Sequence, residues 1–395
     1  MKNYKMNFTE LQVTLSICII FLLRMLGMFM IMPVISTYGI FLRGADHFLL
    51  GLAMGIYGIA QIIFQFPFGF LSDKFGRKPI MMLGLFLFFL GNLITASIHS
   101  IWSLIIGRFL QGSGAISGVS MALLSDFVCE KNRSKSLALI GLSFAISFLI
   151  SMVSGPFIAH FFGFFSIFWL TVFFSILCII IVFFFIPDSN KCNISNTLNI
   201  FNRELLAIIF HKQFLRYYLG IFFLHFLLMI NFMIIPHELE MAKFFISDHW
   251  KLYGITILFS FLFIFLFLFY FKSNFFLKNI IEMSIILLFL SDIIFLYAEN
   301  NLIFLFIAIQ IFFICFNMLE VLLPSDLSKK VLLPHKGSIM SIYSISQFLG
   351  VFLGSFFSGF LLNFFSYKNI FLLIACIIFL WLSISFWCKD KMNYS

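Results

Sequence analysis

The chain is a succession of long apolar runs separated by short segments that carry charged residues, glycine or proline. A membrane-spanning helix needs about 20 consecutive apolar residues, and the runs reach that length without the apolar/polar alternation of barrel strands. We therefore predict an all-α membrane protein with twelve transmembrane helices. The expected spans are 11–36, 47–70, 79–98, 101–125, 136–160, 164–187, 214–236, 250–272, 280–298, 301–324, 337–363 and 367–388.

The spans form two sets of six, separated by the most polar stretch of the chain. We expect an N-terminal six-helix bundle over 1–187, a cytoplasmic linker over 188–213 and a C-terminal six-helix bundle over 214–395. Small residues recur every fourth position in the fifth span of each set, as transporter repeats and tight helix packing favour. These two ladders are Ser143, Ser147, Ser151 and Gly155, and Ser346, Gly350, Gly354 and Ser358.

Composition and charge narrow the class of protein. Hydrophobic residues make up 62% of the chain and charged residues 10%, which no soluble fold accommodates. With the N-terminus inside, cytoplasmic segments collect nineteen Lys and Arg and external segments four, so both termini are predicted to be cytoplasmic. The net charge of +9 then reflects this topology and attraction to membrane lipid, and we expect no nucleic-acid partner.

Enzymatic chemistry and cofactors are not indicated. The seven cysteines are scattered without metal-ligand spacing, and there is no phosphate-binding loop, zinc-protease motif or nucleophile elbow. We expect no enzyme activity, no cofactor and no metal.

The sharpest local motif is the loop after the second span, Gly69-Phe-Leu-Ser-Asp73-Lys-Phe-Gly76-Arg77-Lys78. An ordinary basic loop explains the cations but not the two glycines and the aspartate at this spacing. Gly69 would allow a close helix contact, and Gly76 a tight turn that a Cβ would resist. The loop resembles the signature between helices 2 and 3 of the major facilitator superfamily.

Three further segments resemble motifs of this superfamily, in particular its twelve-helix drug:proton antiporters. They are Arg108-Phe-Leu-Gln111-Gly112 in the fourth span, Gly155-Pro156 in the fifth, and Arg24-Met-Leu-Gly27 with Pro33 in the first. The family members that the chain resembles most closely are bacterial inner-membrane transporters with a soluble domain after helix 12. Since the chain ends at Ser395, soon after the last expected span, we expect it to lack that domain.

The resemblance implies roles for these motifs. The loop would act as a conformational switch, with Asp73 beside the N-terminus of helix 11 and an adjoining ion pair between Arg77 and Asp126. Gly155 and Pro156 would form a kink that bends during transport. An arginine within a span costs about 2.5–3.5 kcal/mol on insertion scales, so Arg108 should face the bundle interior and a partner. It would either lock two helices or tune a nearby carboxylate for proton coupling.

Proton coupling needs a group inside the membrane that changes its protonation state, and few are present. Glu320 in the tenth span and His225 in the seventh are the main candidates, with Arg24 and Arg108 as cations beside the site. Glu320 as a fixed structural carboxylate, and His225 as a hydrogen-bonded interior histidine, are the alternatives. Asp292 is a weaker candidate because its helix is peripheral in the family. Polar residues expected to face a central cavity are Tyr57, Gln61, Gln65, Asn231, Gln310, Asn317 and Gln347.

The sequence thus predicts a monomeric secondary transporter of the bacterial inner membrane, in which two six-helix halves rock about a midplane site. Proton-coupled efflux of a small molecule is the leading hypothesis. A symporter or uniporter that imports a nutrient or metabolite, and a membrane scaffold or sensor that does not transport, are the alternatives. The motifs do not identify the substrate.

Overall fold

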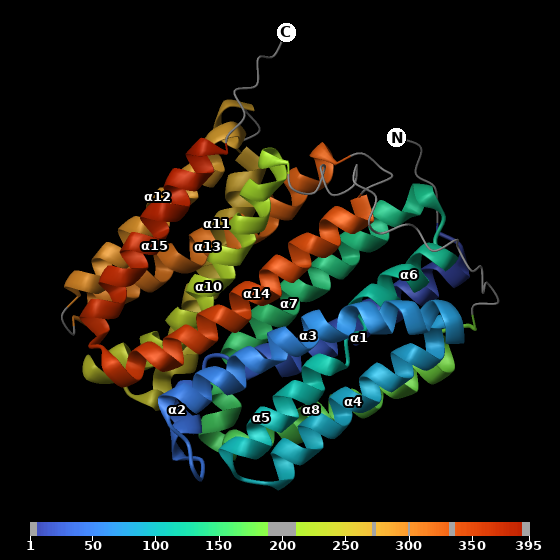
Figure 1. Cartoon of the computed structure of the whole chain (residues 1–395), viewed down its shortest axis with the longest axis horizontal. Coiled ribbons are helices and arrows are strands. Elements are labelled where there is room, and N and C mark those ends of the chain that lie inside the picture. The colour runs from blue at the N-terminus through green and yellow to red at the C-terminus, as the bar shows by residue number, and fades with distance from the viewer. Residues whose placement is uncertain (1–5, 189–210, 271–273, 299–300, 332–335, 389–395) are drawn as a thin grey trace. The chain divides into compact units, whose positions relative to one another are not determined.

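The structure is a computed structural model that describes residues 6–188, 211–270, 274–298, 301–331 and 336–388. Regular structure in these residues is helical, apart from one isolated β-bridge between Arg43 and Ser100 (Figure 1). The chain divides into two compact units, Met1–Thr197 and Leu198–Ser395. Most of the expected linker at 188–213 lies outside the described residues.

The N-terminal unit contains the first run of helices. They are α1 (Phe8–Met30), α2 (Ile35–Tyr38), η1 (Gly39–Phe41), α3 (His47–Phe75), α4 (Arg77–Ser97), α5 (Ile101–Ser113), α6 (Ser117–Phe127), α7 (Glu130–Phe162) and α8 (Phe164–Phe185). The C-terminal unit contains the second run of helices. They are α10 (Lys212–Met241), η2 (Ile246–Asp248), α11 (His249–Tyr270), α12 (Asn274–Tyr297), α13 (Leu302–Lys330), α14 (Lys336–Phe364) and α15 (Tyr367–Trp387).

Eleven of the described helices are long and apolar enough to cross a membrane, and a broken pair forms the remaining span. This pair is α5 and α6, which together cover the expected span 101–125. The expected span 11–36 is wrong at its end, because α1 stops at Met30 and the chain turns through residues 31–34 into α2. Pro33 lies in this turn. Proline has no backbone N–H, so it could not donate the hydrogen bond that a continuous helix needs at this position.

The break between α5 and α6 lies where two glycines pack closely on neighbouring helices. A Cβ on Gly112 would collide with the backbone of Tyr57 in α3, and one on Gly114 with the backbone of Gly84 in α4. At the break, Ala115 N–H donates to Ser113 O at 2.8 Å. In a continuous helix it would donate to the carbonyl of Gln111, four residues back. The break leaves this carbonyl free for a side-chain donor.

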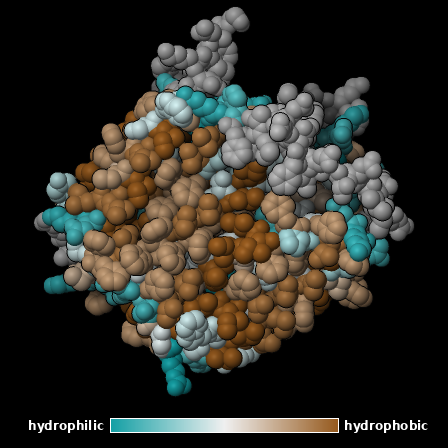
Figure 2. Space-filling model, in the orientation of Figure 1, coloured by the Kyte–Doolittle hydropathy of each residue, from teal (hydrophilic) through white to brown (hydrophobic). Residues whose placement is uncertain are grey.

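The outward faces of the helices are apolar, as a lipid environment requires. Figure 2 shows hydrophobic residues over the visible helix surfaces and hydrophilic ones toward the helix ends. Large side chains such as Leu258, Phe265 and Phe379 are more than 60% exposed, which is expected where lipid rather than water surrounds the helix. The described part of the chain is thus built to span a membrane several times.

The two units repeat one order of helix pairing. In the N-terminal unit, α1 packs on α7 and α8, while α4 packs on α5 and α8. In the C-terminal unit, α10 packs on α14 and α15, while α12 packs on α13 and α15. The pairing of α3 with α5 likewise matches that of α11 with α13, so each unit is one copy of the same six-span arrangement.

In each unit the small-residue ladder lies at the first of these contacts. Ser147 and Ser151 of α7 donate hydrogen bonds of 3.1 Å to the carbonyls of Leu22 and Leu26 in α1. One turn further on, a Cβ on Gly155 would collide with the carbonyl of Met30. The ladders therefore bring helix backbones into direct contact, which side chains of ordinary size would prevent.

The C-terminal ladder makes the equivalent contact. A Cβ on Gly350 would collide with the carbonyl of Phe222, and one on Gly354 with the carbonyl of Phe226. These atoms belong to the backbone of α10 and cannot move aside as a flexible side chain does. The short distance between the backbones of α10 and α14 thus requires glycine at both positions.

We expect Gly155→Ala and Gly354→Ala to destabilise the protein by about 1–3 kcal/mol each, because overpacking separates helix backbones that are in contact. The matched control is Gly141→Ala in α7, where an added Cβ meets no atom within 4 Å. That change should be neutral or slightly stabilising, since alanine is the better helix former. Thermal unfolding of the detergent-solubilised protein measures the difference, and similar responses at all three glycines would contradict it.

Candidate functional site

Arg108 of α5 lies in the interior of the N-terminal unit and is 2% exposed. Its Nη1 donates to Gln111 Oε1 at 3.0 Å, and its guanidinium carbon lies 4.8 Å from the centre of the Tyr57 ring. Gln111 Nε2 in turn donates to Asn92 Oδ1 of α4 at 3.0 Å. The expected orientation of Arg108 toward the bundle interior is therefore found, with amide and aromatic partners.

Arg24 of α1 joins the same cluster and is 1% exposed. Its Nη2 lies 3.5 Å from Gln111 O, the carbonyl that the break between α5 and α6 leaves without its helical partner. Its guanidinium carbon lies 5.3 Å from the centre of the Phe88 ring. Both arginines thus contact Gln111, one through its backbone and the other through its side chain.

Neither arginine has a carboxylate beside it in the N-terminal unit. Among the ion pairs of the described residues, none involves Arg24 or Arg108. The hypothesis that Arg108 tunes a nearby carboxylate therefore has no support within its own unit. Two buried cations held by carbonyls, amides and rings are an expensive arrangement in a membrane, and such residues mark functional sites by default.

The other polar candidates of this unit surround the cluster on α3. Tyr57 is buried against Arg108, and Gln61 donates through Nε2 to Ser117 Oγ of α6 at 3.4 Å. Gln65, one turn further along, is partly exposed and its Oε1 has no hydrogen-bond partner. Tyr57 and Gln61 thus belong to the interior around the helix break.

In the C-terminal unit, three of the predicted residues come together. Gln347 Nε2 of α14 lies 2.9 Å from His225 Nε2 of α10 and 3.3 Å from Glu320 Oε1 of α13. His225 Nε2 and Glu320 Oε2 are 3.7 Å apart. His225 is buried, whereas Glu320 is partly exposed. We call these three residues the His225 cluster.

Hydrogen bonding indicates which tautomer the neutral imidazole adopts. His225 Nδ1 lies 3.2 Å from Ile221 O, a carbonyl that only accepts, so Nδ1 carries the hydrogen. In the neutral imidazole, Nε2 is then an acceptor for the amide of Gln347. A proton taken up at Nε2 would displace that amide and create an imidazolium facing the Glu320 carboxylate. The cluster thus brings together an imidazole, a carboxylate and an amide from three helices.

The remaining cavity candidates of this unit lie elsewhere. Gln310 donates through Nε2 to Thr256 O and Ser260 Oγ of α11, so it links α13 to α11. Asn317 is buried and its Nδ2 has no hydrogen-bond partner. Asn231 and Asp292 line a small cavity among apolar side chains, away from the His225 cluster. The sequence does not distinguish these orientations, because they depend on which face of each helix is packed.

The switch loop turns between α3 and α4 at Gly76, whose φ of +95° favours glycine. Arg77 pairs with Asp73 and lies 3.5 Å from Asp126 Oδ2 at the end of α6. The expected ion pair between Arg77 and Asp126 is therefore present. Lys78 pairs with Asp188 at 3.6 Å.

Gly69 does not make the close contact expected of it within its own unit. A Cβ built on this residue meets no atom within 4 Å. Gly155 and Pro156 lie inside the continuous helix α7, where Gly155 serves the close packing on α1. Bending at this pair stays a prediction.

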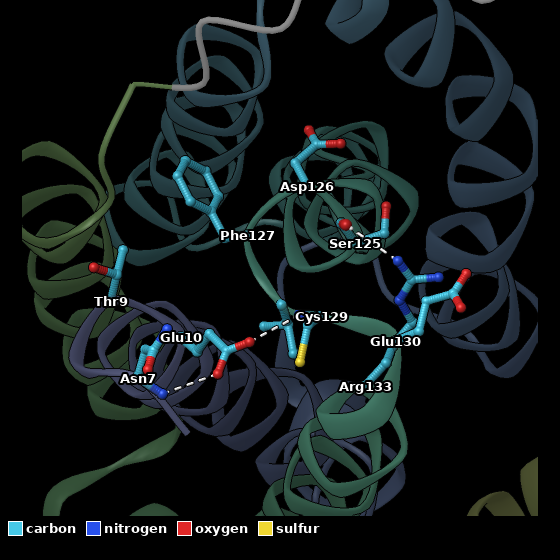
Figure 3. A pocket seen from close by; sticks show the side chains of 10 residues that line it. Asn7, Thr9, Glu10, Ser125, Asp126, Phe127, Cys129, Glu130 and Arg133 are labelled. Atoms are coloured by element: carbon cyan, nitrogen blue, oxygen red, sulfur yellow. Dashed lines mark hydrogen bonds between the residues drawn. The ribbon is translucent and has the colours of Figure 1, made fainter. Parts of the chain in front are cut away.

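A shallow pocket near Asp126 shows how this end of the unit is held together (Figure 3). Glu10 of α1 accepts hydrogen bonds of 2.9 Å from Cys129 N, at the start of α7, and from Asn7 N. It also accepts one of 3.0 Å from Asn132 Nδ2. The carboxylate thus fixes α1 to the connection between α6 and α7, and so helps to position Asp126 for Arg77.

Two clusters in the C-terminal unit escaped the sequence prediction. Arg216 of α10, which the charge count placed in a cytoplasmic segment, is buried and pairs with Glu282 of α12. Tyr217 donates to Asp326 of α13, and Lys330 lies 3.2 Å from the same carboxylate. Asp326 ends the segment Leu-Leu-Pro-Ser-Asp at 322–326, which is similar to Leu-Leu-Ser-Asp at 123–126. In the sequence, only this similarity indicates a polar cluster at Asp326.

Comparisons with known proteins agree with this architecture. The chain is 60% identical over 352 residues to an uncharacterized transporter of Buchnera aphidicola from Acyrthosiphon pisum, covering 88% of this chain and 90% of the relative. It is 39% identical to the inner membrane transport protein YajR of Escherichia coli, covering 99% and 86%. It is 33% identical to the class B tetracycline resistance protein of Escherichia coli, over only 37% and 36% of the two chains.

A solved structure and a family model complete the comparison. The crystal structure of a D-xylose–proton symporter has a TM-score of 0.77 at 15% identity and covers 97% of this chain and 98% of its own, which shows a common fold. The family model described as Major Facilitator Superfamily matches residues 17–330. With the repeated six-span units and the switch loop, these matches show that the chain belongs to the Major Facilitator Superfamily of membrane transporters.

Proposed function

We propose that the protein is a proton-coupled exporter of small molecules in a bacterial inner membrane, working by alternating access with both termini in the cytoplasm. The observation that carries the proton coupling is the His225 cluster, which places an imidazole and a carboxylate 3.7 Å apart on α10 and α13. Membrane lipid, protons and the substrate are the partners, and the protein acts as a monomer.

The cluster supplies a physical link between protonation and helix movement. With neutral His225, Gln347 donates to the imidazole, which connects α14 to α10. With protonated His225, the imidazolium attracts Glu320 and no longer accepts from Gln347, so the cluster loses one link between α10 and α14 and strengthens the one between α10 and α13. Proton uptake would thus change the polar links among these helices, while the glycine contacts between α10 and α14 remain.

Export is favoured by sequence features and by one relative. The Gly155-Pro156 pair resembles the antiporter motif of the superfamily, and the partial match to a tetracycline resistance protein points the same way. The similarity to YajR, an inner membrane transport protein, supports the proposed location. The switch loop would favour closure of the cytoplasmic side, and loss of its charges would favour inward opening.

Removing the titratable groups should uncouple transport from the proton gradient. We expect Glu320→Gln and His225→Ala to abolish substrate-dependent proton movement in proteoliposomes, while exchange of labelled for unlabelled substrate persists. Tetracycline is the first compound to test, because a relative is named for it. Dye-reported pH change and substrate counterflow are the two measurements.

The matched control is Glu240→Gln, which neutralises an exposed carboxylate at the far end of α10 and should leave coupling intact. Arg108→Ala tests the prediction from the sequence that Arg108 also contributes to coupling, although no described carboxylate of its own unit pairs with it. If substrate moves equally well after the proton gradient has been collapsed, the proposal of antiport is wrong.

The switch loop generates a separate expectation. Asp73→Asn removes one of the two carboxylates at Arg77 and should raise the inward-open population by about fivefold or more, a typical coupling between two states. Maleimide labelling of a single cysteine introduced by Ser341→Cys on α14, in a cysteine-free background, measures this population. Asp188→Asn, which removes the partner of Lys78, is the control. Equal labelling of the two variants would show that Asp73 does not hold the closed state.

A further inference from the structure

Arg24 and Arg108 form a pair of buried cations whose positive charges are not neutralised within their unit. They lie on α1 and α5, are 1% and 2% exposed, and both contact Gln111. No ion pair among the described residues joins a carboxylate of the N-terminal unit to either arginine. Glu10 binds the start of α7, and Asp73 and Asp126 bind Arg77.

The two side chains retain most of their hydrogen-bonding capacity. A guanidinium has five N–H donors in a planar fork. Arg24 makes one hydrogen bond, at 3.5 Å, and Arg108 makes one, at 3.0 Å. The Nε atoms of both residues are buried and have no hydrogen-bond partner. Buried guanidinium donors without acceptors are unfavourable unless a ligand supplies the acceptors.

The neighbouring groups suit an organic anion. Tyr57 and Phe88 place aromatic rings beside the two guanidinium groups, and Asn92 and Gln111 add amides. Arginine binds a planar carboxylate through two parallel hydrogen bonds, and apolar walls accept the body of such a ligand. A positively charged substrate would instead meet two like charges.

We propose that Arg24 and Arg108 bind the carboxylate group of the transported substrate, which is therefore a small organic acid carried as its anion. This inference rests on the proposed function, since it names the class of substrate for the same transporter. Gln111 acts as a positioning residue that holds the two guanidinium groups around one site, and the break after α5 frees its carbonyl for Arg24.

Binding to the purified full chain tests this directly, without any proton gradient. The probes are benzoate and 4-phenylbutyrate, each compared with its neutral amide, and inorganic phosphate as an alternative oxyanion. We expect the carboxylates to bind and the amides not to bind. Arg24→Gln and Arg108→Gln should weaken carboxylate binding by about tenfold or more, since each loses a charge-assisted pair. Arg43→Gln, at an exposed arginine of the same unit, is the control.

Gln111→Glu is the decisive variant, because it places an internal carboxylate between the two arginines. We expect it to abolish carboxylate binding, since the new charge neutralises the buried cations and occupies their free donors. Arg24→Lys keeps the charge without the fork and should bind with intermediate affinity. Unchanged carboxylate binding to Gln111→Glu would overturn the inference.

The remaining outcomes are equally distinct. Equal binding of acids and amides, binding of phosphate but neither carboxylate, or binding of no probe would also overturn the carboxylate site. None of these affects proton-coupled transport measured separately. Conversely, carboxylate binding could depend on the two arginines while transport does not depend on the proton gradient. That result would overturn the proposed proton coupling and support the proposed carboxylate site.

Discussion

The direct contact of helix backbones between α1 and α7, and between α10 and α14, is the constraint on which the rest of the molecule depends. Lipid gives no hydrophobic drive for helix association, so close packing and interhelical hydrogen bonds must supply it. Gly155 and Gly354 permit the approach, and Ser147 and Ser151 add hydrogen bonds to carbonyls of α1. The same face of α14 carries Gln347, so the packing that joins α14 to α10 also sets Gln347 against His225.

The shared scaffold carries different chemistry in its two copies. On α1 the segment between the carbonyls of Leu22 and Leu26 bears Arg24, and on α10 the segment between Phe222 and Phe226 bears His225. The N-terminal copy therefore holds two buried arginines, while the C-terminal copy holds an imidazole beside a carboxylate. Under our two proposals, one arrangement of helices serves substrate binding in one unit and proton exchange in the other.

How far the sequence predicts the structure depends on whether a feature is local. Apolar runs, the glycine turn at Gly76 and the small-residue ladders are visible in a few neighbouring residues, so the spans and their repeat are predictable. The break between α5 and α6 falls in a segment rich in glycine and serine, Gln111 to Gly118, which is a local signal that the prediction of one continuous span passed over. The pairing of Arg216 with Glu282 joins groups 66 positions apart, and only packing reveals it.

The partners of the buried arginines explain why a transporter tolerates them. A resident carboxylate would neutralise Arg108 permanently and would compete with any anion entering from water. Amide oxygens, a freed carbonyl and aromatic faces stabilise a guanidinium less strongly, so a bound anion can add to them rather than having to displace a charge. With these weaker partners, the two guanidinium groups stay available to an anion. Packing of the fold, and not a counter-ion, then offsets the unfavourable free energy of the buried charge. The discontinuity at Gly114 serves this arrangement, since only a broken helix offers Arg24 an unpaired carbonyl in the middle of a membrane span.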